Sequence, residues 1–394
     1  MWDLKIKAVI NLDANATTGM LPEVLEAMLP WLSGVQANPS GSYRTAKLAR
    51  KAVDQAREQV ADLIGAHPDE IIFTGSGTES VNTALNSLDK LTGEGRALVS
   101  AIEHSAVLRF VESRERAYDL SPVNQDGLIN LEAFSELCKG AGYVSTMAAN
   151  NETGMIQPLA EIINIAKENG LPVHSDAIQA AGKISISVRD LPVDVLSISA
   201  HKFHGPKGIG ALYVRKGLEF APLIFGGGQE KNRRSGTENV PAIVGMGMAA
   251  QLAKFYLEHD RKENIAAERD AFEDYLLANV PGCLRNGDPT HRLPNTSHLS
   301  FEGCDSAGML ILLDEAGVAC AAGSACMTGK QKPSHVQLAM GIPESRAKTS
   351  LRFSFSRENR SGDTLVAAEK VRKCVEKLRN VQGSGIGPVA IYTS

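Results

Sequence analysis

The chain has 394 residues, of which 43% are hydrophobic and 22% are charged. These values are ordinary for a soluble globular enzyme, and the length is sufficient for a large core and two domains. A net charge of −4 and the lack of a basic block exclude a typical nucleic-acid-binding protein. Because no apolar run reaches membrane-spanning length and the first residues lack a signal-peptide core, we expect a cytoplasmic protein with no membrane partner.

The six cysteines are few for this length and include no Cys-x-x-Cys pair. This pattern predicts reduced thiols rather than a disulfide framework, and it predicts no metal site. Most of these side chains should be buried packing residues. The cysteines are Cys138, Cys283, Cys304, Cys320, Cys326 and Cys374.

The first 65 residues predict two helices joined by a loop. Residues 11–18 are polar and turn-like, and residues 20–31 have a helical pattern. Residues 38–42 form a loop by composition. Apolar residues at helical spacing then predict an amphipathic helix over residues 45–64, with Gly65 as a plausible stop.

Residues 70–85 predict a strand, a glycine-rich turn and a helix. Backbone amides at a helix start form an anion site, and Gly75 and Gly77 allow the backbone to approach the anion closely. Thr78 would add a hydroxyl group. The spacing matches neither a Walker loop nor a dinucleotide-binding fold, which favours a phosphate on another kind of ligand. The alternative is a glycine-rich turn capped by threonine.

Strands are predicted over residues 97–102, 142–149 and 171–180, with a helix over residues 159–169. Their alternation predicts a mostly parallel α/β sheet. His104 follows the first of these strands, and polar residues follow the others. Ligands bind at the carboxyl ends of the strands in such sheets, so these polar residues are candidate site residues.

Two apolar runs around residues 194–199 and 209–214 predict buried strands, and the turn between them carries Lys202. Burial and nearby cations lower the pKa of a lysine, which makes Schiff-base chemistry with a carbonyl group possible. Lys207 lies between proline and glycine and is better interpreted as a solvated turn residue. Residues 225–237 predict a mobile, anion-friendly loop.

A long helical pattern covers residues 242–277, and shorter strands are predicted over residues 296–301 and 350–354. The change in pattern places a domain boundary near residue 255. The prediction is a large domain of residues 13–255 and a smaller α+β domain made of residues 1–12 and 256–394.

Together these features describe a site for pyridoxal 5′-phosphate. That cofactor needs an aldehyde trap, a phosphate anchor and a carboxylate beside its ring nitrogen. Lys202, Thr78 and Asp176 can supply these groups. His104 could stack on the ring, and Gln179 could donate to the ring oxygen.

The motifs resemble those of cysteine desulfurases over nearly the whole chain. The spacing from Cys326 to Pro333-Ser334 resembles that of the group I, NifS-like and IscS-like enzymes of the class-V aminotransferase family. The matching strings are Glu103-His104, Asn150-Asn151-Glu152-x-Gly154, Asp176-Ala-x-Gln179, Ser199-x-His201-Lys202, Arg234-Ser-Gly-Thr237, Gly323-Ser-Ala-Cys326, Pro333-Ser-His-Val336 and Arg352-Phe-Ser.

The resemblance implies a fold-type I enzyme dependent on pyridoxal phosphate, with a seven-stranded sheet, acting as a homodimer with shared active sites. It implies that Lys202 attaches the cofactor and moves protons, and that His104 stacks on the ring. The phosphate would be bound by Gly77, Thr78, Ser199 and His201, and by Thr237 of the neighbouring subunit. Asn151 would lie near the ring oxygen and the substrate, and Arg352 would pair with the substrate carboxylate.

The resemblance also implies the reaction. The Cys326 thiolate would take the sulfur of L-cysteine, leaving L-alanine and a persulfide whose sulfur passes to an acceptor or scaffold protein, for example for iron-sulfur clusters. Cys320 is a rival nucleophile, although its apolar surroundings favour packing. The alternatives are a selenocysteine lyase, another fold-type I aminotransferase, or a non-catalytic sulfur-carrier or scaffold protein.

Overall fold

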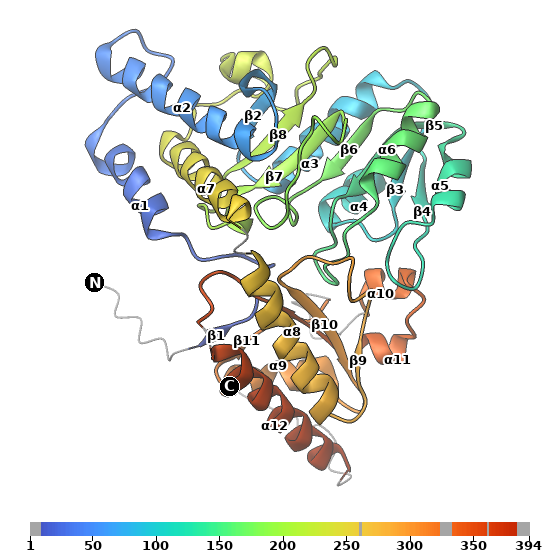
Figure 1. Cartoon of the computed structure of the whole chain (residues 1–394). Helices are drawn as coiled ribbons and strands as arrows, with labels where there is room; N and C mark the ends of the chain where they lie inside the picture. The colour runs from blue at the N-terminus through green and yellow to red at the C-terminus, as the bar shows by residue number, and fades with distance from the viewer. Residues whose placement is uncertain (1–8, 260–261, 324–332, 361, 384–394) are drawn as a thin grey trace, which may run out of the picture.

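A seven-stranded sheet forms the centre of the larger part of the molecule (Figure 1). The computed structural model describes residues 9–259, 262–323, 333–360 and 362–383. The strand order is β2-β8-β7-β6-β5-β3-β4, and only the pairings of β8 are antiparallel. The strands are β2 (Ile71–Thr74), β3 (Arg96–Ser100), β4 (Tyr118–Ser121), β5 (Ala141–Met147), β6 (Val173–Asp176), β7 (Val195–Ser199) and β8 (Gly210–Val214).

Helices cover both faces of this sheet. Successive strand residues point to opposite faces, so Ile71 and Phe73 enter one hydrophobic cluster while Ile72 enters the other. The first cluster includes residues of α1 (Pro22–Leu29), α2 (Arg44–Leu63), α5 (Leu131–Cys138), α6 (Leu159–Glu168) and α7 (Val240–Glu258). The second includes residues of α3 (Gly77–Leu91) and α4 (Ser105–Glu112). The predicted α/β class is therefore confirmed.

Single-turn helices complete this part of the chain. A π-helical turn, η1 (Pro30–Gly34), extends α1, and 3₁₀ turns precede β2, follow β7 and precede α7. These 3₁₀ turns are η2 (Pro68–Glu70), η3 (Ala200–Lys202) and η4 (Gln229–Asn232).

The predicted helix over residues 242–277 is two helices. α7 ends at Glu258, where His259 leaves the helical conformation, and α8 (Lys262–Asn279) follows. By length and composition alone α7 could span a membrane, which corrects the expectation that no apolar run is long enough. Its buried residues instead belong to the cluster that also includes α1 and α2. The apolar composition of α7 is that of a core helix.

The rest of the chain forms a second group of elements around its own hydrophobic cluster (Figure 1). The antiparallel strands β9 (Cys283–Arg285), β10 (Thr296–Phe301) and β12 (Ser350–Ser354) form one sheet, and β1 (Ile10–Asn11) pairs with β11 (Val318–Ala319). The helices that contribute to this cluster are α8, α9 (Ser306–Glu315) and α12 (Asp363–Gly383), whereas α10 (His335–Ala339) and α11 (Glu344–Ala347) contribute to a smaller cluster with Ile102 and Met147. We propose the domain boundary near residue 255; the separate cluster, which contains Leu12 and residues 272–375, supports it.

A buried carboxylate ties the elements of this second group together. Glu273 of α8 is fully buried and accepts hydrogen bonds from both Arg292 and Arg285, the shortest at 2.7 and 2.5 Å respectively. The Ser297 hydroxyl of β10 also donates to Glu273, at 2.6 Å. Removing one member of such a group leaves buried charges without compensation.

We expect Glu273→Gln to lower the free energy of unfolding by about 3–5 kcal/mol, because both guanidinium groups lose the buried carboxylate that they share and Arg292 keeps only the longer 3.3 Å pair with Asp270. Urea unfolding followed by circular dichroism measures the change. The matched control is Glu136→Gln, which breaks an exposed pair with Lys139 and should cost less than about 1 kcal/mol. Equal losses in the two variants would contradict this assignment.

Candidate active site

Ten of the twelve predicted site residues line one cavity of about 370 Å³. The strands other than β8 run in one direction, so their carboxyl ends meet at one edge of the sheet, and the cavity lies there. Arg352 enters from β12 of the second group of elements. The ten residues are Gly77, Thr78, His104, Asn151, Asp176, Gln179, Ser199, His201, Lys202 and Arg352. Their individual roles remain predictions.

Lys202 closes the short 3₁₀ turn that follows β7. Its Nζ donates to the backbone oxygens of Asn15, at 2.5 Å, and Ala16, at 2.9 Å. Burial, followed by the positive charge of Arg352, lowers the pKa of Lys202 to about 8. An amine with this pKa is partly neutral near pH 7 and can act as a nucleophile.

Asp176 is the last residue of β6 and is 5% exposed. Its Oδ1 accepts a 2.9 Å hydrogen bond from the backbone N–H of Ile178. Burial raises the pKa of Asp176 to about 6, although this hydrogen bond and Lys202 act in the opposite direction. A cationic group beside this carboxyl would therefore stabilise its charged form.

His104 caps the start of α4, where its Nδ1 accepts a 3.1 Å hydrogen bond from the N–H of Ala106. Burial lowers the pKa of His104, and Lys202 and His335 add to this effect. Because Nδ1 accepts, the ring proton of the neutral form lies on Nε2. His104 is thus a neutral aromatic group in the wall of the cavity.

The glycine-rich turn is followed by the start of α3 at Gly77, which lines the cavity; its role as an anion site stays a prediction. A Cβ atom at Gly77 would lie 2.5 Å from the Ile178 side chain, so only glycine allows this close packing. The Ser199 hydroxyl faces the same cavity and is buried without a hydrogen-bond partner in the described part of the chain. The Ser76 side chain caps α3 by accepting from the Glu79 N–H. An orphaned hydroxyl beside a helix start fits a phosphate oxygen.

His201 lies across the anion site from α3. Its Nδ1 is 3.2 Å from the Thr17 hydroxyl. Burial and three neighbouring lysines, of which Lys202 has the largest effect, lower the pKa of His201 to about 4. His201 therefore offers a neutral hydrogen-bonding group, not a permanent cation.

The Arg352 guanidinium is only partly available. One amino group donates to the backbone oxygen of Asn151 at 2.8 Å, and the other pairs with Asp13 at 2.6 Å. Its Nε is buried and has no partner among the described residues. An unpaired buried donor at the cavity wall fits a ligand carboxylate.

Thr237 is the predicted residue that lies elsewhere in the described chain. It lines a smaller hollow with Gly75 and Arg234, outside the cavity of Lys202. Its predicted contact with the cofactor of a neighbouring subunit stays a prediction. Cys326, the predicted nucleophile, lies outside the described residues.

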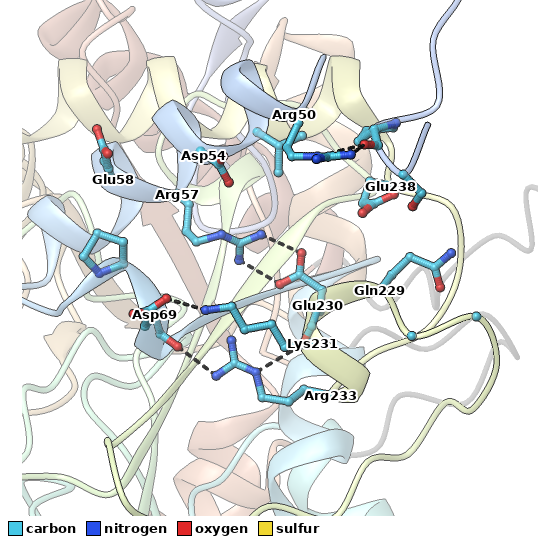
Figure 2. Close-up of a pocket in the computed structure, with 16 residues that line it drawn as sticks. Arg50, Asp54, Arg57, Glu58, Asp69, Gln229, Glu230, Lys231, Arg233 and Glu238 are labelled. Atoms are coloured by element: carbon cyan, nitrogen blue, oxygen red, sulfur yellow. Dashed lines mark hydrogen bonds and ion pairs between the residues drawn. The ribbon is translucent and has the colours of Figure 1, made fainter. Parts of the chain in front are cut away.

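Charge pairs hold the loop that leads to Thr237. They lie in another hollow, of about 570 Å³, that is separate from both the cavity of Lys202 and the hollow of Thr237. Figure 2 shows the Arg57 guanidinium facing the Glu230 carboxylate, with N–O distances of 2.7 and 2.8 Å. Three consecutive residues of this loop have positive φ angles, between 50° and 66°, which residues other than glycine rarely adopt. They are Glu230, Lys231 and Asn232. The Arg57 pair and the Lys231–Asp69 pair stabilise this strained turn.

Cys320, the rival thiol, directly follows β11 and packs against the hydrophobic cluster of the second group. Burial raises its pKa to about 12, so the thiolate that a nucleophile needs is disfavoured. These surroundings support a packing role.

Asn15 is a site residue that the sequence did not reveal. It lies in the predicted turn over residues 11–18 and is 1% exposed. Its backbone oxygen accepts from Lys202 and Gln179, and its side chain contacts Thr296 and Asn295 of the second group. The only available signal was its place in a polar run.

Glu152, which appeared in a motif without a role, is buried beside the cavity. The Ser334 hydroxyl donates to its Oε2 at 2.5 Å, and a Cβ atom at Gly323 would overlap that oxygen. Burial raises the pKa of Glu152 to about 7, although Ser334 and Arg352 lower it. The carboxyl therefore contacts the two described residues, Gly323 and Ser334, that flank residues 324–333.

Glu152 should make stability fall as the pH rises. Its pKa is higher in the folded chain than in the unfolded one, so its contribution is fully present below about pH 4.5 and is lost as the pH rises through 7. We expect Glu152→Gln to be more stable than the parent protein at pH 8, by about 3 kcal/mol. The two should differ little at pH 4.5.

Thermal unfolding between pH 4.5 and 8 measures this difference. The matched control is Glu168→Gln, which replaces an exposed glutamate on α6 and should follow the parent protein at every pH. A parallel pH dependence of Glu152→Gln and the parent protein would contradict the prediction.

Comparison with known proteins identifies the family. A family model described as aminotransferase class-V matches residues 10–364. The chain is 43% identical over 377 residues to a cysteine desulfurase of Trichormus azollae, covering 94% of each chain, and 40% identical over 390 residues to cysteine desulfurase NifS of Azotobacter vinelandii, covering 97% of each. A solved structure of SspA in complex with cysteine is 36% identical, with a TM-score of 0.76, covering 88% of this chain and 98% of that one. The chain therefore belongs to the class-V aminotransferase family and, within it, to the NifS-like cysteine desulfurases.

Proposed function

We propose that this protein uses pyridoxal 5′-phosphate to remove the sulfur of L-cysteine, giving L-alanine and a persulfide on Cys326. One observation carries the proposal: a lysine of lowered pKa and a buried carboxyl, Lys202 and Asp176, line the same cavity as the start of α3. The family and the cysteine-bound relative support the substrate. When bound, the cofactor supplies an electron sink for bond breaking at the substrate Cα.

The phosphate would be bound at the start of α3. The Gly77 amide and the hydroxyls of Thr78 and Ser199 would donate to it, with His201 on the opposite side. The unpaired Ser199 hydroxyl supports this assignment, because a buried donor without an acceptor is otherwise unfavourable.

The ring would lie between His104 and the floor of the cavity. The Asp176 carboxylate would accept a hydrogen bond from the protonated ring nitrogen, and this charge pair would offset the cost of burying the carboxylate. Gln179 would donate from Nε2 to the ring oxygen. Each role uses a group that already lines the cavity.

Lys202 would hold the cofactor by its aldehyde carbon through Nζ. As a free amine, the same Nζ would take up the Cα proton of the substrate and release it again, since its lowered pKa permits both exchanges near neutral pH. The Nε of Arg352 would bind the substrate carboxylate, and Asn151 would lie beside it.

Cys326 would perform the sulfur transfer. Its thiolate attacks the substrate sulfur, an S–S bond forms and the C–S bond breaks. The electron pair of that bond stays on the carbon, which takes up a proton to become the methyl group of alanine. Exchange with a thiol of an acceptor protein would then release the sulfur. We further propose a cytoplasmic homodimer in which Thr237 completes the partner's site.

Cys326→Ala should lower alanine formation from cysteine by two orders of magnitude or more, roughly the loss expected for a missing nucleophile. Mass spectrometry after incubation with cysteine should find one added sulfur on Cys326 in the parent protein. Cys320→Ala is the matched control and should retain both signals. Sulfur on Cys320 instead would overturn the choice of nucleophile.

Lys202→Ala should abolish covalent attachment of pyridoxal phosphate. After treatment of the protein with cofactor and borohydride, peptide mass spectrometry should find the reduced cofactor on Lys202 only. The control is Lys207→Ala, which removes an exposed lysine from the same turn and should leave the adduct unchanged. If the parent protein forms no adduct, the cofactor assignment fails.

A further inference from the structure

A second lysine, Lys183, lies beside Lys202 and has no role in the reaction proposed above. It follows Gly182, whose φ of +75° and close packing on Phe203 bring the loop after β6 against the turn that carries Lys202. As a whole Lys183 is half-buried. Burial of its amine, and then the charges of Lys202 and Arg352, lower the pKa of Lys183 well below its usual value.

The Lys183 amine contacts two amide oxygens. It donates to Oε1 of Gln179 at 2.6 Å and to Oδ1 of Asn15 at 2.9 Å. A lysine ammonium group has donors only, and a neutral amine still has two N–H groups for these two oxygens. The ammonium form of Lys183 therefore requires the oxygen of each amide as its neighbour, and the neutral amine keeps the same two contacts with its two N–H groups.

This choice fixes which end of Gln179 faces the cavity. With Oε1 directed at Lys183, the Nε2 group donates to the backbone oxygen of Asn15 at 2.9 Å. The same oxygen accepts from Lys202. The two donors thus converge on one atom, and the NH₂ group of Gln179 lies on the Lys202 side.

Asn15 is oriented in the same way. Its Oδ1 accepts from Lys183 and from Asn295, while its Nδ2 donates to the Thr296 hydroxyl at 2.9 Å. The Asn15 side chain therefore cannot turn over without placing an NH₂ group against the donors of Lys183 and Asn295. This keeps in place the carbonyl oxygen that both Lys202 and Gln179 use.

We propose that Lys183 is a positioning residue that holds the Gln179 amide with its NH₂ group toward the ring oxygen of the cofactor. The inference rests on the proposed function, because it requires pyridoxal phosphate in the cavity. A hydrogen-bond donor at that oxygen stabilises its negative charge. It would therefore lower the pKa of the Lys202 nitrogen when this nitrogen is joined to the cofactor. An amide turned the other way would place Oε1 there and repel the charge.

The test is a pH titration of the absorbance of the bound cofactor, a measurement that does not depend on turnover. Lys183→Met should raise the midpoint by roughly one pH unit, since the Gln179 amide is then free to turn. Lys183→Arg keeps a donor-only side chain and should stay near the parent midpoint. Asp176, Asp13 and Arg352, which also act on Lys202, are unchanged in every variant.

A double-mutant cycle separates positioning from the charge of Lys183 itself. In a Gln179→Ala background, Lys183→Met should have no further effect on the midpoint. A shift of equal size with and without Gln179 would overturn the inference, as would an unchanged midpoint in Lys183→Met. If Lys183→Met does not bind the cofactor, Lys183→Gln replaces it. Because its amide can accept as well as donate, its midpoint should rise above that of Lys183→Arg, and an unchanged midpoint would overturn the inference.

Failure of the proposed function gives a different result. In that case the parent protein shows no cofactor absorbance and no borohydride adduct on Lys202. If the adduct is present but the double-mutant cycle shows the same shift with and without Gln179, then only the inference about Lys183 is wrong and the proposed function stands.

Discussion

The short segment around Asn15 is the contact on which the site depends. Its backbone oxygen holds Lys202 and Gln179 from the large sheet, and its side chain reaches Thr296 and Asn295 of the second group. The residues of β1, just before it, pair with β11. Because the segment lies between two separate hydrophobic clusters, the geometry of the cavity is set by how these clusters are joined. A change that separated them would move Arg352 away from Lys202.

The cavity combines opposite charges in surroundings that disfavour both. Burial raises the pKa of Asp176 to about 6, and burial, followed by Asp176, raises that of the adjacent Glu103 well above its usual value. Burial also lowers the pKa values of Lys202, Lys183 and His201. Perturbed groups of both signs concentrate where chemistry occurs, since a structure selected only for stability would not bury them together. A ligand with an anionic phosphate and a cationic ring would stabilise the charged forms of both the basic and the acidic groups.

The sequence was most informative where the signal is local. The strands over residues 296–301 and 350–354 have the predicted bounds, and the polar residues after β3 and β6 do line one cavity. The choice of Lys202 over Lys207 used only neighbouring residues, and in the structure Lys202 is half-buried and Lys207 is exposed. Hydrophobic periodicity and the rule for parallel sheets are sufficient for such inferences.

Contacts between distant residues gave no such signal. Asn15 and Thr296 are 281 positions apart, and nothing in a polar turn indicates that its side chain will be fully buried. The break between α7 and α8 was missed because neither proline nor glycine marks it. Lys183 was passed over because a lysine after glycine at the end of a loop usually lies in solvent. In each case the tertiary structure, not the local sequence, decides the environment of the side chain.

The two groups of elements each supply one charged side chain to the cavity, an arrangement that suits an amino acid with its amine and its carboxylate. In the proposed reaction the substrate amine would reach Lys202, which the sheet positions, and the substrate carboxylate would reach Arg352 on β12. The Asn151 backbone oxygen accepts hydrogen bonds from both Arg352 and Asn15, and so connects the Arg352 side of the cavity with the segment that contacts Lys202. A substrate that bridges these groups would be held at two points about its Cα, which fixes the direction of the bond to be broken. Binding in this way would align the reacting atoms, so in the proposed reaction the interface between the two clusters would contribute to catalysis.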